Sequence, residues 1–175
     1  MPWPTILLLL LAAIVATAYV TKPKHVHIRF TRIPPVVARV NRPTPNATPE
    51  NRRIDLPTGD TYTAPAQSKG HFVLVFDWQV PIRLDGHGAV LLIPRLSTTD
   101  FASVPRPLHA LISPLNNTIY SAVVHDYLYR RPQDPFAANL DRATVDRLFH
   151  WGMRARGVSR LTAGLMYLGV RVCSC

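Results

Sequence analysis

The residues best suited to chemistry are one histidine and three aspartates in the second half of the chain. They are Asp100, His125, Asp126 and Asp146. His125 and Asp126 are adjacent within an apolar stretch, and Asp146 directly follows Val145 in a second apolar pattern. Because an unpaired buried charge is costly, carboxylates on helices that face a small core need partners. We therefore expect these side chains to lie close together.

The first interpretation of the cluster is a metal-assisted hydrolytic site. Imidazole nitrogens and carboxylate oxygens bind divalent cations, and a bound cation activates water. The candidate ligands are His125, Asp126, Asp146 and Asp100, and the candidate catalytic residues are His125, Asp126 and Asp100. Consecutive helical residues point about 100° apart, so His125 and Asp126 reach one ion only where the helix edge faces a cleft. His150 lies four residues after Asp146, a spacing that permits joint ligation.

The second interpretation is a buried hydrogen-bond network without chemistry. Asp100 would cap a helix that starts near Ser103, and Arg106 would pair with one of the two later aspartates. A carboxylate or a backbone carbonyl would hold His125. In this interpretation Ser103 and Arg106 are structural residues, and no substrate is involved.

The elements that carry these residues predict a small α+β domain over residues 71–175. Residues 72–76 and 89–93 are rich in strand-forming types, with turn residues at 85–88 between them, which predicts a hairpin or paired strands. Trp78–Pro81 is expected to end the first strand. Three to four helices follow, each signalled by a capping residue before apolar residues at helical spacing. They are expected to begin near Ser103, at Asn116 or Asn117, after Asp141 and at Ser159.

Residues 1–20 predict either a transmembrane helix or a signal segment. Residues 6–20 carry no charge. A helix over them rises about 22 Å, against roughly 30 Å of hydrocarbon, so a single span needs Trp3 and Tyr19 at the two interfaces. Basic residues follow the apolar run but do not precede it, which favours a retained anchor in a bacterial inner membrane or a virion. Ala16–Ala18 has the small-x-small form of a cleavage site, and cleavage would give a secreted or periplasmic protein.

Residues 21–70 predict an extended, basic linker. The segment holds eight prolines, and nine Lys and Arg residues against three acidic ones. Proline interrupts helices and removes ladder donors, so we expect a partly polyproline-like spacer without a core. Residues 25–30 alternate and could add a strand. The positive charge could attract anionic lipid or nucleic acid.

Length and composition limit the possible classes of protein. A chain of 175 residues forms one domain, or at most two. Its two cysteines, Cys173 and Cys175, exclude a disulfide-scaffolded mini-protein and a four-cysteine zinc module. The chain also lacks the glycine-rich loop that cradles a nucleotide phosphate.

Three sequence blocks resemble a known family. They are Thr99-Asp100-Phe101-Ala102-Ser103-Val104-Pro105-Arg106, then Ala122-Val123-Val124-His125-Asp126-Tyr127-Leu128-Tyr129, and then Asp146-Arg147-Leu148-Phe149 with Met153 and Gly157-Val158. Over residues 72 to 172, approximately, the chain resembles the short phage and bacterial proteins grouped as domain of unknown function 1353. The resemblance implies a phage or prophage origin and no established activity. The anchor and the linker lie outside that domain.

Two functions are compatible with these observations. The first is a membrane-anchored phage or prophage accessory protein, a structural or interaction module of the virion or of host lysis. Its partners would be membrane lipid, through residues 6–20, and virion or cell-envelope proteins. The alternative is a metal-dependent hydrolase with the His/Asp site in the C-terminal domain, for which a divalent metal ion is the implied cofactor. Whether the chain is an enzyme depends on which interpretation of the polar cluster is right.

Overall fold

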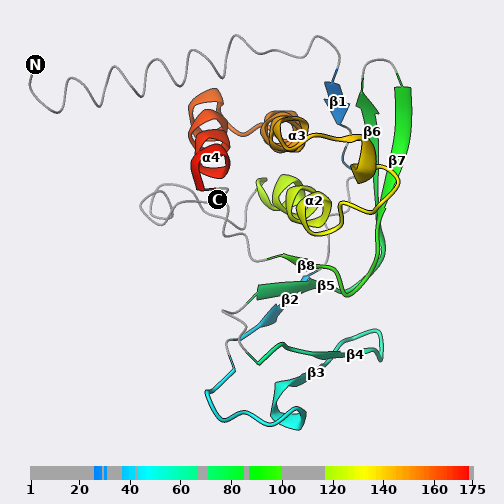
Figure 1. Ribbon diagram of the computed structural model, residues 1–175, viewed down its shortest axis with the longest axis vertical. Coiled ribbons are helices and arrows are strands. Elements are labelled where there is room, and N and C mark those ends of the chain that lie inside the picture. The colour runs from blue at the N-terminus through cyan, green and yellow to red at the C-terminus, as the bar shows by residue number, and fades with distance from the viewer. Residues whose placement is uncertain are drawn as a thin grey trace, which may run out of the picture.

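The computed structural model describes residues 26–28, 30, 37–41, 43–66, 71–84, 87–99 and 117–173 (Figure 1). The predicted anchor (residues 1–20), the helix expected near Ser103, and the residues Asp100 and Arg106 lie outside this part of the chain. Within it, no helix is both long and apolar enough to cross a membrane.

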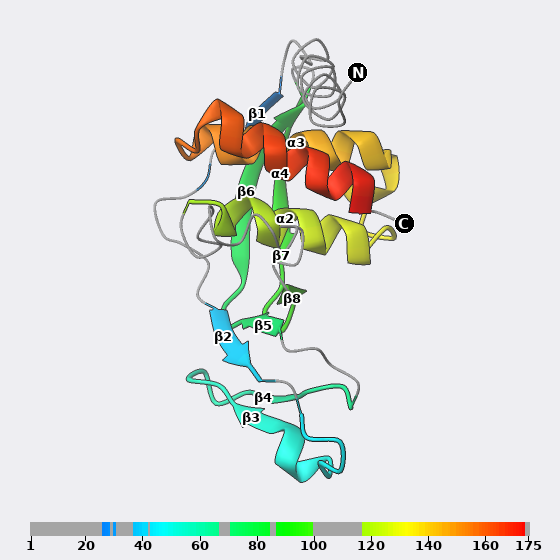
Figure 2. The same cartoon turned by 90° about the vertical axis from the view of Figure 1, so that its left-hand side faces the viewer.

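The described strands form two three-stranded sheets and one hairpin, and all pairs are antiparallel. The first sheet has the order β1 (Val26–Ile28), β6 (Trp78–Leu84), β7 (His87–Ile93). The second has the order β2 (Val37–Val40), β5 (His71–Leu74), β8 (Thr98–Thr99). The hairpin pairs β3 (Arg53–Asp55) with β4 (Thr61–Thr63), after a short 3-10 helix, η1 (Glu50–Arg52). Figure 2 shows the hairpin at the end of the molecule away from the helices.

The expected paired strands are present, but the partner of β7 is β6 and not residues 72–76. Trp78–Pro81 lies inside β6, so the prediction that it ends a strand is wrong. From Trp78 to Ile82 the side chains alternate between buried and exposed, which is the pattern of a strand with one covered face. Pro81 has no N–H to donate to a neighbouring strand. It is tolerated because the pairing of β6 with β1 covers Ile82 to Leu84 and does not include Pro81.

The described part of residues 21–70 differs from the predicted extended linker. β1 pairs with β6 and β2 pairs with β5, so this segment supplies an edge strand to each sheet. Val40, Leu56, Ala64 and Val73 form a small buried cluster. Pro57 and Pro65 follow β3 and β4 and mark the ends of these strands without interrupting them. A high proline content did not prevent strands here, because the prolines stand between the short strands.

In the described part of the chain three α-helices follow the strands, which confirms the α+β class. They are α2 (Ile119–Arg130), α3 (Arg142–Ala155) and α4 (Arg160–Cys173), with a 3-10 turn, η3 (Ala137–Asn139), before α3. The predicted caps of α3 and α4 are present: Asp141 Oδ1 accepts the Thr144 N–H at 2.7 Å, and Ser159 Oγ accepts the Thr162 N–H at 3.1 Å. The N-cap of α2 is Thr118, which makes no side-chain capping hydrogen bond, and not Asn116 or Asn117 as predicted. Gly157 ends α3 with a φ of 82°, a conformation that favours glycine.

The helix α2 has almost no exposed face, because every residue from Tyr120 to Leu128 is buried. A helix covered all round lies in the interior of a fold. Figure 1 shows α2 and α3 between the β1-β6-β7 sheet and α4. The main core includes Val80, Ile93, Val124, Phe149 and Met166, from the sheet and all three helices. His125 and Asp126 therefore lie inside the molecule.

Candidate functional site

The centre of the site is the carboxylate of Asp146, on α3, which is 0% exposed. Its Oδ1 accepts hydrogen bonds from His125 Nε2 at 2.9 Å and from the Tyr129 hydroxyl at 2.8 Å. Its Oδ2 accepts from a guanidinium N–H of Arg171, on α4, at 3.2 Å. Three donors on two oxygens satisfy this buried charge, and they join α2, α3 and α4.

The imidazole of His125 has one nitrogen engaged and one without a hydrogen bond. Because the carboxylate of Asp146 only accepts, Nε2 carries a hydrogen. Nδ1 has no hydrogen-bond partner among the described residues, although His125 is only 4% exposed. The rings of Tyr129 and Phe149 pack against the imidazole at centroid distances of 4.4 and 5.0 Å. The histidine is held in one orientation with Nδ1 free to act as an acceptor in the neutral form.

Asp126 lies on the Nδ1 side of the same imidazole. Its Oδ1 is 3.7 Å from Nδ1, which is an ion-pair distance but too long for a hydrogen bond. Its Oδ2 accepts a hydrogen bond from the Thr99 hydroxyl at 2.5 Å, which ties β8 to α2. Asp126 is itself buried. The Nδ1 edge of the imidazole therefore faces a buried carboxylate that does not hydrogen-bond to it.

The two carboxylates face different nitrogens of the imidazole. Asp146 bonds Nε2 and Asp126 faces Nδ1, so His125 stands between them. This order makes a carboxylate–imidazole–carboxylate series and does not point the three side chains at one ion. Within the described ranges, no group of three or more His, Cys, Asp or Glu side chains is placed to hold a metal ion.

The structure brings together three of the four residues singled out in the sequence. His125, Asp126 and Asp146 are in contact, and Asp100 lies outside the described residues. The predicted partners Ser103 and Arg106 also fall outside them. His150 does not join the group: its ring contacts Trp151 and Tyr167.

Two residues that donate hydrogen bonds to Asp146, Tyr129 and Arg171, were not predicted from the sequence as members of this cluster. Tyr129 lies four residues after His125, so the two share a helix face, and this spacing was a usable signal. Arg142 supports Tyr129 by donating from Nε to its hydroxyl at 2.8 Å. Arg171 is 25 residues from Asp146, and no local pattern predicts their contact.

The site shifts the pKa values of its members. Burial alone would raise the pKa of the Asp146 carboxyl, but hydrogen bonds from His125, Tyr129 and Arg171 outweigh it and lower the pKa below its ordinary value. Burial lowers the pKa of His125, but the carboxylates of Asp126 and Asp146 outweigh burial and raise it. The pKa of Arg171 is raised, chiefly by its bond to Asp146. The network thus favours a charged imidazole beside a charged carboxylate.

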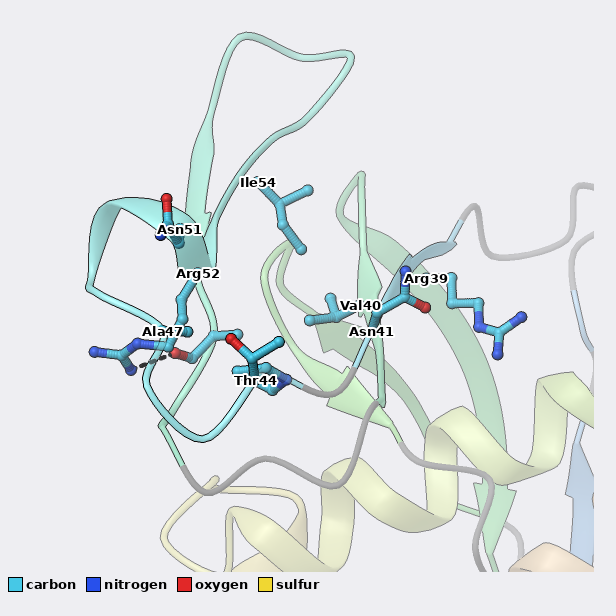
Figure 3. A pocket seen from close by; sticks show the side chains of 10 residues that line it. Arg39, Val40, Asn41, Thr44, Ala47, Asn51, Arg52 and Ile54 are labelled. Atoms are coloured by element: carbon cyan, nitrogen blue, oxygen red, sulfur yellow. Dashed lines mark hydrogen bonds between the residues drawn. The ribbon is translucent and has the colours of Figure 1, made fainter.

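A cleft lies elsewhere, between β2 and the segment that leads into β3. Its volume is about 610 Å³, and it is lined by Arg39, Val40, Asn41, Pro43, Thr44, Ala47, Asn51, Arg52, Ile54 and Ala64. Figure 3 shows Val40 and Ile54 facing the cleft, while the guanidinium of Arg39 points away from it. A guanidinium N–H of Arg52 donates to the carbonyl of Ala64 at 2.7 Å, a contact between the two ends of the β3–β4 hairpin. None of the residues around His125 lines this cleft.

The fold and site define a small α+β protein whose central helix carries a buried histidine held by a carboxylate. The sequence pattern of the family described as "Protein of unknown function (DUF1353)" matches residues 76–170, more than half of the chain. The chain belongs to this family, which confirms the resemblance noted from the sequence. No curated protein and no solved structure matches the chain.

Proposed function

We propose that the chain is a hydrolase in which His125 activates a water molecule. The observation that carries the proposal is the buried Nδ1 of His125, which has no hydrogen-bond partner among the described residues while Nε2 is fixed by Asp146. A histidine that serves only packing usually has both nitrogens satisfied, because an unsatisfied buried polar atom costs about 1–3 kcal/mol. A catalytic base must instead keep its acceptor nitrogen available, and because the pKa of His125 is raised, this neutral form gains population only as the pH rises above the ordinary value of 6.5.

The other residues have supporting roles in this proposal. Asp146 would fix the imidazole tautomer and stabilise the imidazolium that forms when water is deprotonated. Tyr129 and Arg171 are positioning residues, because they act on Asp146 and not on the reacting atoms. Asp126, whose Oδ1 is 3.7 Å from Nδ1, is the carboxylate on the side of the imidazole where the water would be deprotonated.

The alternative is that the domain is a structural or interaction module. The observation that favours it is the saturation of Asp146, whose three hydrogen bonds hold three helices together. In both proposals we place the protein in a membrane, anchored by residues 6–20, as an accessory protein of a phage or prophage. Virion or cell-envelope proteins are then its proposed partners.

The test is a substrate panel with the full-length chain, comprising a carboxylic ester, a phosphodiester and bacterial cell-wall fragments. Each assay is run with a chelator, with Ca²⁺ and with Zn²⁺. The hydrolase proposal expects turnover of at least one substrate that is lost in Asp126→Asn. A stimulation by one cation that also disappears in Asp126→Asn would assign the cation to this carboxylate. No turnover of any substrate under any of these conditions would overturn the hydrolase proposal in favour of the structural module.

A further inference from the structure

Strand β7 has an open edge in the described part of the chain. It is the last strand in the order β1-β6-β7, and all seven of its residues pair with β6. No described strand pairs with its other edge. Figure 1 shows β7 at the margin of the molecule, with β6 on its inner side. The backbone N–H and C=O groups of such an edge are a template for another strand.

The sequence of β7 lacks the features with which proteins protect an edge strand. Charged side chains, prolines and bulges are the usual means, because each of them opposes the approach of a second strand. From His87 to Ile93 there is no Lys, Arg, Asp, Glu or Pro. The register with β6 runs without a break, so the strand also has no bulge. β7 is therefore suited to pairing along its whole length, about 24 Å.

The outer face of β7 is apolar and exposed. Val90 is 61% exposed and Leu92 is 51% exposed, whereas Leu91 and Ile93 are buried on the inner face. The partner of Val90 on β6 is Pro81, which is exposed as well. Packing within the described part of this chain therefore does not account for large apolar residues at positions 90 and 92.

An identical strand fits this edge. Two copies of β7 can run antiparallel about a two-fold axis at Val90, the middle of the strand. Val90 then lies opposite Val90 of the second copy, and Leu92 lies opposite Gly88. A Cβ at Gly88 would meet nothing within 4 Å and its φ is not positive, so nothing in the described part of the chain requires glycine there. Opposite Leu92, a glycine leaves room for the leucine side chain.

We propose that β7 pairs with β7 of a second copy of this chain, which joins the two three-stranded sheets into one continuous sheet. On its outer face, Pro81 and Val90 of one copy would continue into Val90 and Pro81 of the other, beside Leu92 of each. The exposed apolar residues of β7 would thus become one stripe at the centre of the dimer. This inference does not depend on the hydrolase proposed above.

The distribution of charge favours a second copy as the occupant. Each copy has a net charge of +10, so two copies repel one another wherever their charges approach. Arg83 is the one charged residue of β6 and lies opposite Gly88. In the proposed register the two Arg83 residues are about 20 Å apart, about twice the Debye length at 0.1 M salt. A charged partner would find no countercharge on β7, whereas an uncharged strand fits it.

The test is the oligomeric state of the full-length chain in detergent micelles, measured by sedimentation over a range of protein concentrations. The test variant is Val90→Lys, which would place two ammonium groups opposite each other at the two-fold axis, where like charges destabilise a strand pair. The matched control is Leu161→Lys, a leucine that is 66% exposed on α4. Circular dichroism establishes that each variant is folded.

A second measurement reports on the register. Val90→Cys and Gln79→Cys are each made in a chain whose Cys173 and Cys175 are replaced by serine, and a short thiol-reactive cross-linker is added. Gln79 is exposed on the same face as its β6–β7 partner Leu92. In the proposed register the two residues at position 90 are adjacent, whereas the two at position 79 are about 20 Å apart.

We expect the parent and Leu161→Lys to be dimers, and Val90→Lys to dissociate with a Kd raised at least about tenfold by the juxtaposed charges. Val90→Cys should cross-link and Gln79→Cys should not. A monomeric parent would overturn the proposal and leave the edge to a different partner. A dimer that persists in Val90→Lys would overturn it as well, and would assign self-association to another segment, such as residues 6–20. Equal cross-linking at both positions would overturn the edge-to-edge pairing in favour of sheets packed face to face.

Discussion

At the scale of residues, Asp146 is the position on which the site depends most. Its carboxylate is completely buried and accepts from His125, Tyr129 and Arg171. Removing one partner of a buried ion pair destabilises the fold by more than the pair contributes to stability, because the remaining charge stays buried without a partner. This asymmetry makes the network sensitive to a change of a single atom.

Asp146→Asn should therefore lower the free energy of unfolding by about 3–5 kcal/mol. The amide keeps the size of the side chain but removes the charge and presents an N–H₂ group to one of the three donors. Urea denaturation of the parent and the variant measures the difference. Asp55→Asn is the matched control, since Asp55 is exposed on β3 and should change stability by less than about 0.5 kcal/mol. Equal stability of the parent and Asp146→Asn would contradict the network.

The stability should also depend on pH in a direction set by the pKa values. His125 has a raised pKa, so its contribution is present below its ordinary value of 6.5 and is lost as the pH rises through the raised value. Asp146 has a lowered pKa, so its contribution is present above 3.8 and is lost as the pH falls through the lowered value. The pair contributes most between these limits. Denaturation at a series of pH values should show a decline above about 6.5 that is reduced in His125→Gln, and an equal decline in both proteins would contradict this assignment.

At the scale of elements, α2 and α3 approach closely at Gly152. A Cβ atom there would lie 2.5 Å from Ser121 Oγ and 3.0 Å from Phe30 Cζ. Both distances are shorter than van der Waals contact, so the helices would have to separate. Ser121 is on the same helix as His125, and a shift of α2 relative to α3 would also change the distance from His125 to Asp146.

Gly152→Ala should lower the free energy of unfolding by about 1–3 kcal/mol through overpacking. Gly164→Ala is the control, because a Cβ there meets nothing within 4 Å and α4 should gain up to about 1 kcal/mol from the better helix former. Thermal unfolding of the two variants measures both effects. A melting temperature of Gly152→Ala at or above that of the parent would show that the two helices are not in close contact.

Local elements were predictable from the sequence, and long-range pairing was not. Asp141, Gly157 and Ser159 identified the limits of α3 and α4, because capping depends on residues within one turn. The strand pairs β1–β6 and β2–β5 join residues more than 30 positions apart, and no local pattern specifies such partners. For the same reason His125 could be predicted as a site residue, because it is a polar residue within an apolar stretch. Arg171 could not, because its contact with Asp146 forms only when α4 packs on α3.

At the scale of the whole molecule, the folded unit begins earlier than the change in composition at residue 71 suggests. β1 and β2 provide edge strands to the two sheets, and the side chains of Ile28 and Val40 are buried. Phe30 packs against Trp78 and Tyr120, with ring centroids 5.9 and 5.4 Å away. The core around the site therefore requires residues before 71.

A chain shortened to residues 71–175 should be less stable than one of residues 26–175, by at least about 3 kcal/mol, because burial of several large apolar side chains is lost. Chemical denaturation with tryptophan fluorescence compares them, and Trp78, which packs against Phe30, reports on the loss directly. Equal unfolding midpoints would show that residues 26–64 are a dispensable linker, as composition alone suggested.

The central claim is that His125 is a catalytic base, and the most direct test is kcat/KM of the parent chain and of His125→Ala for the substrate of the panel that the parent chain turns over. The unfolding free energy is measured on the same samples, so that loss of folding is separated from loss of chemistry. The account predicts a fall in kcat/KM of about 10²–10⁴ at a temperature where both proteins are fully folded. A folded His125→Ala protein with unchanged kcat/KM would contradict the claim and leave His125 as a structural residue.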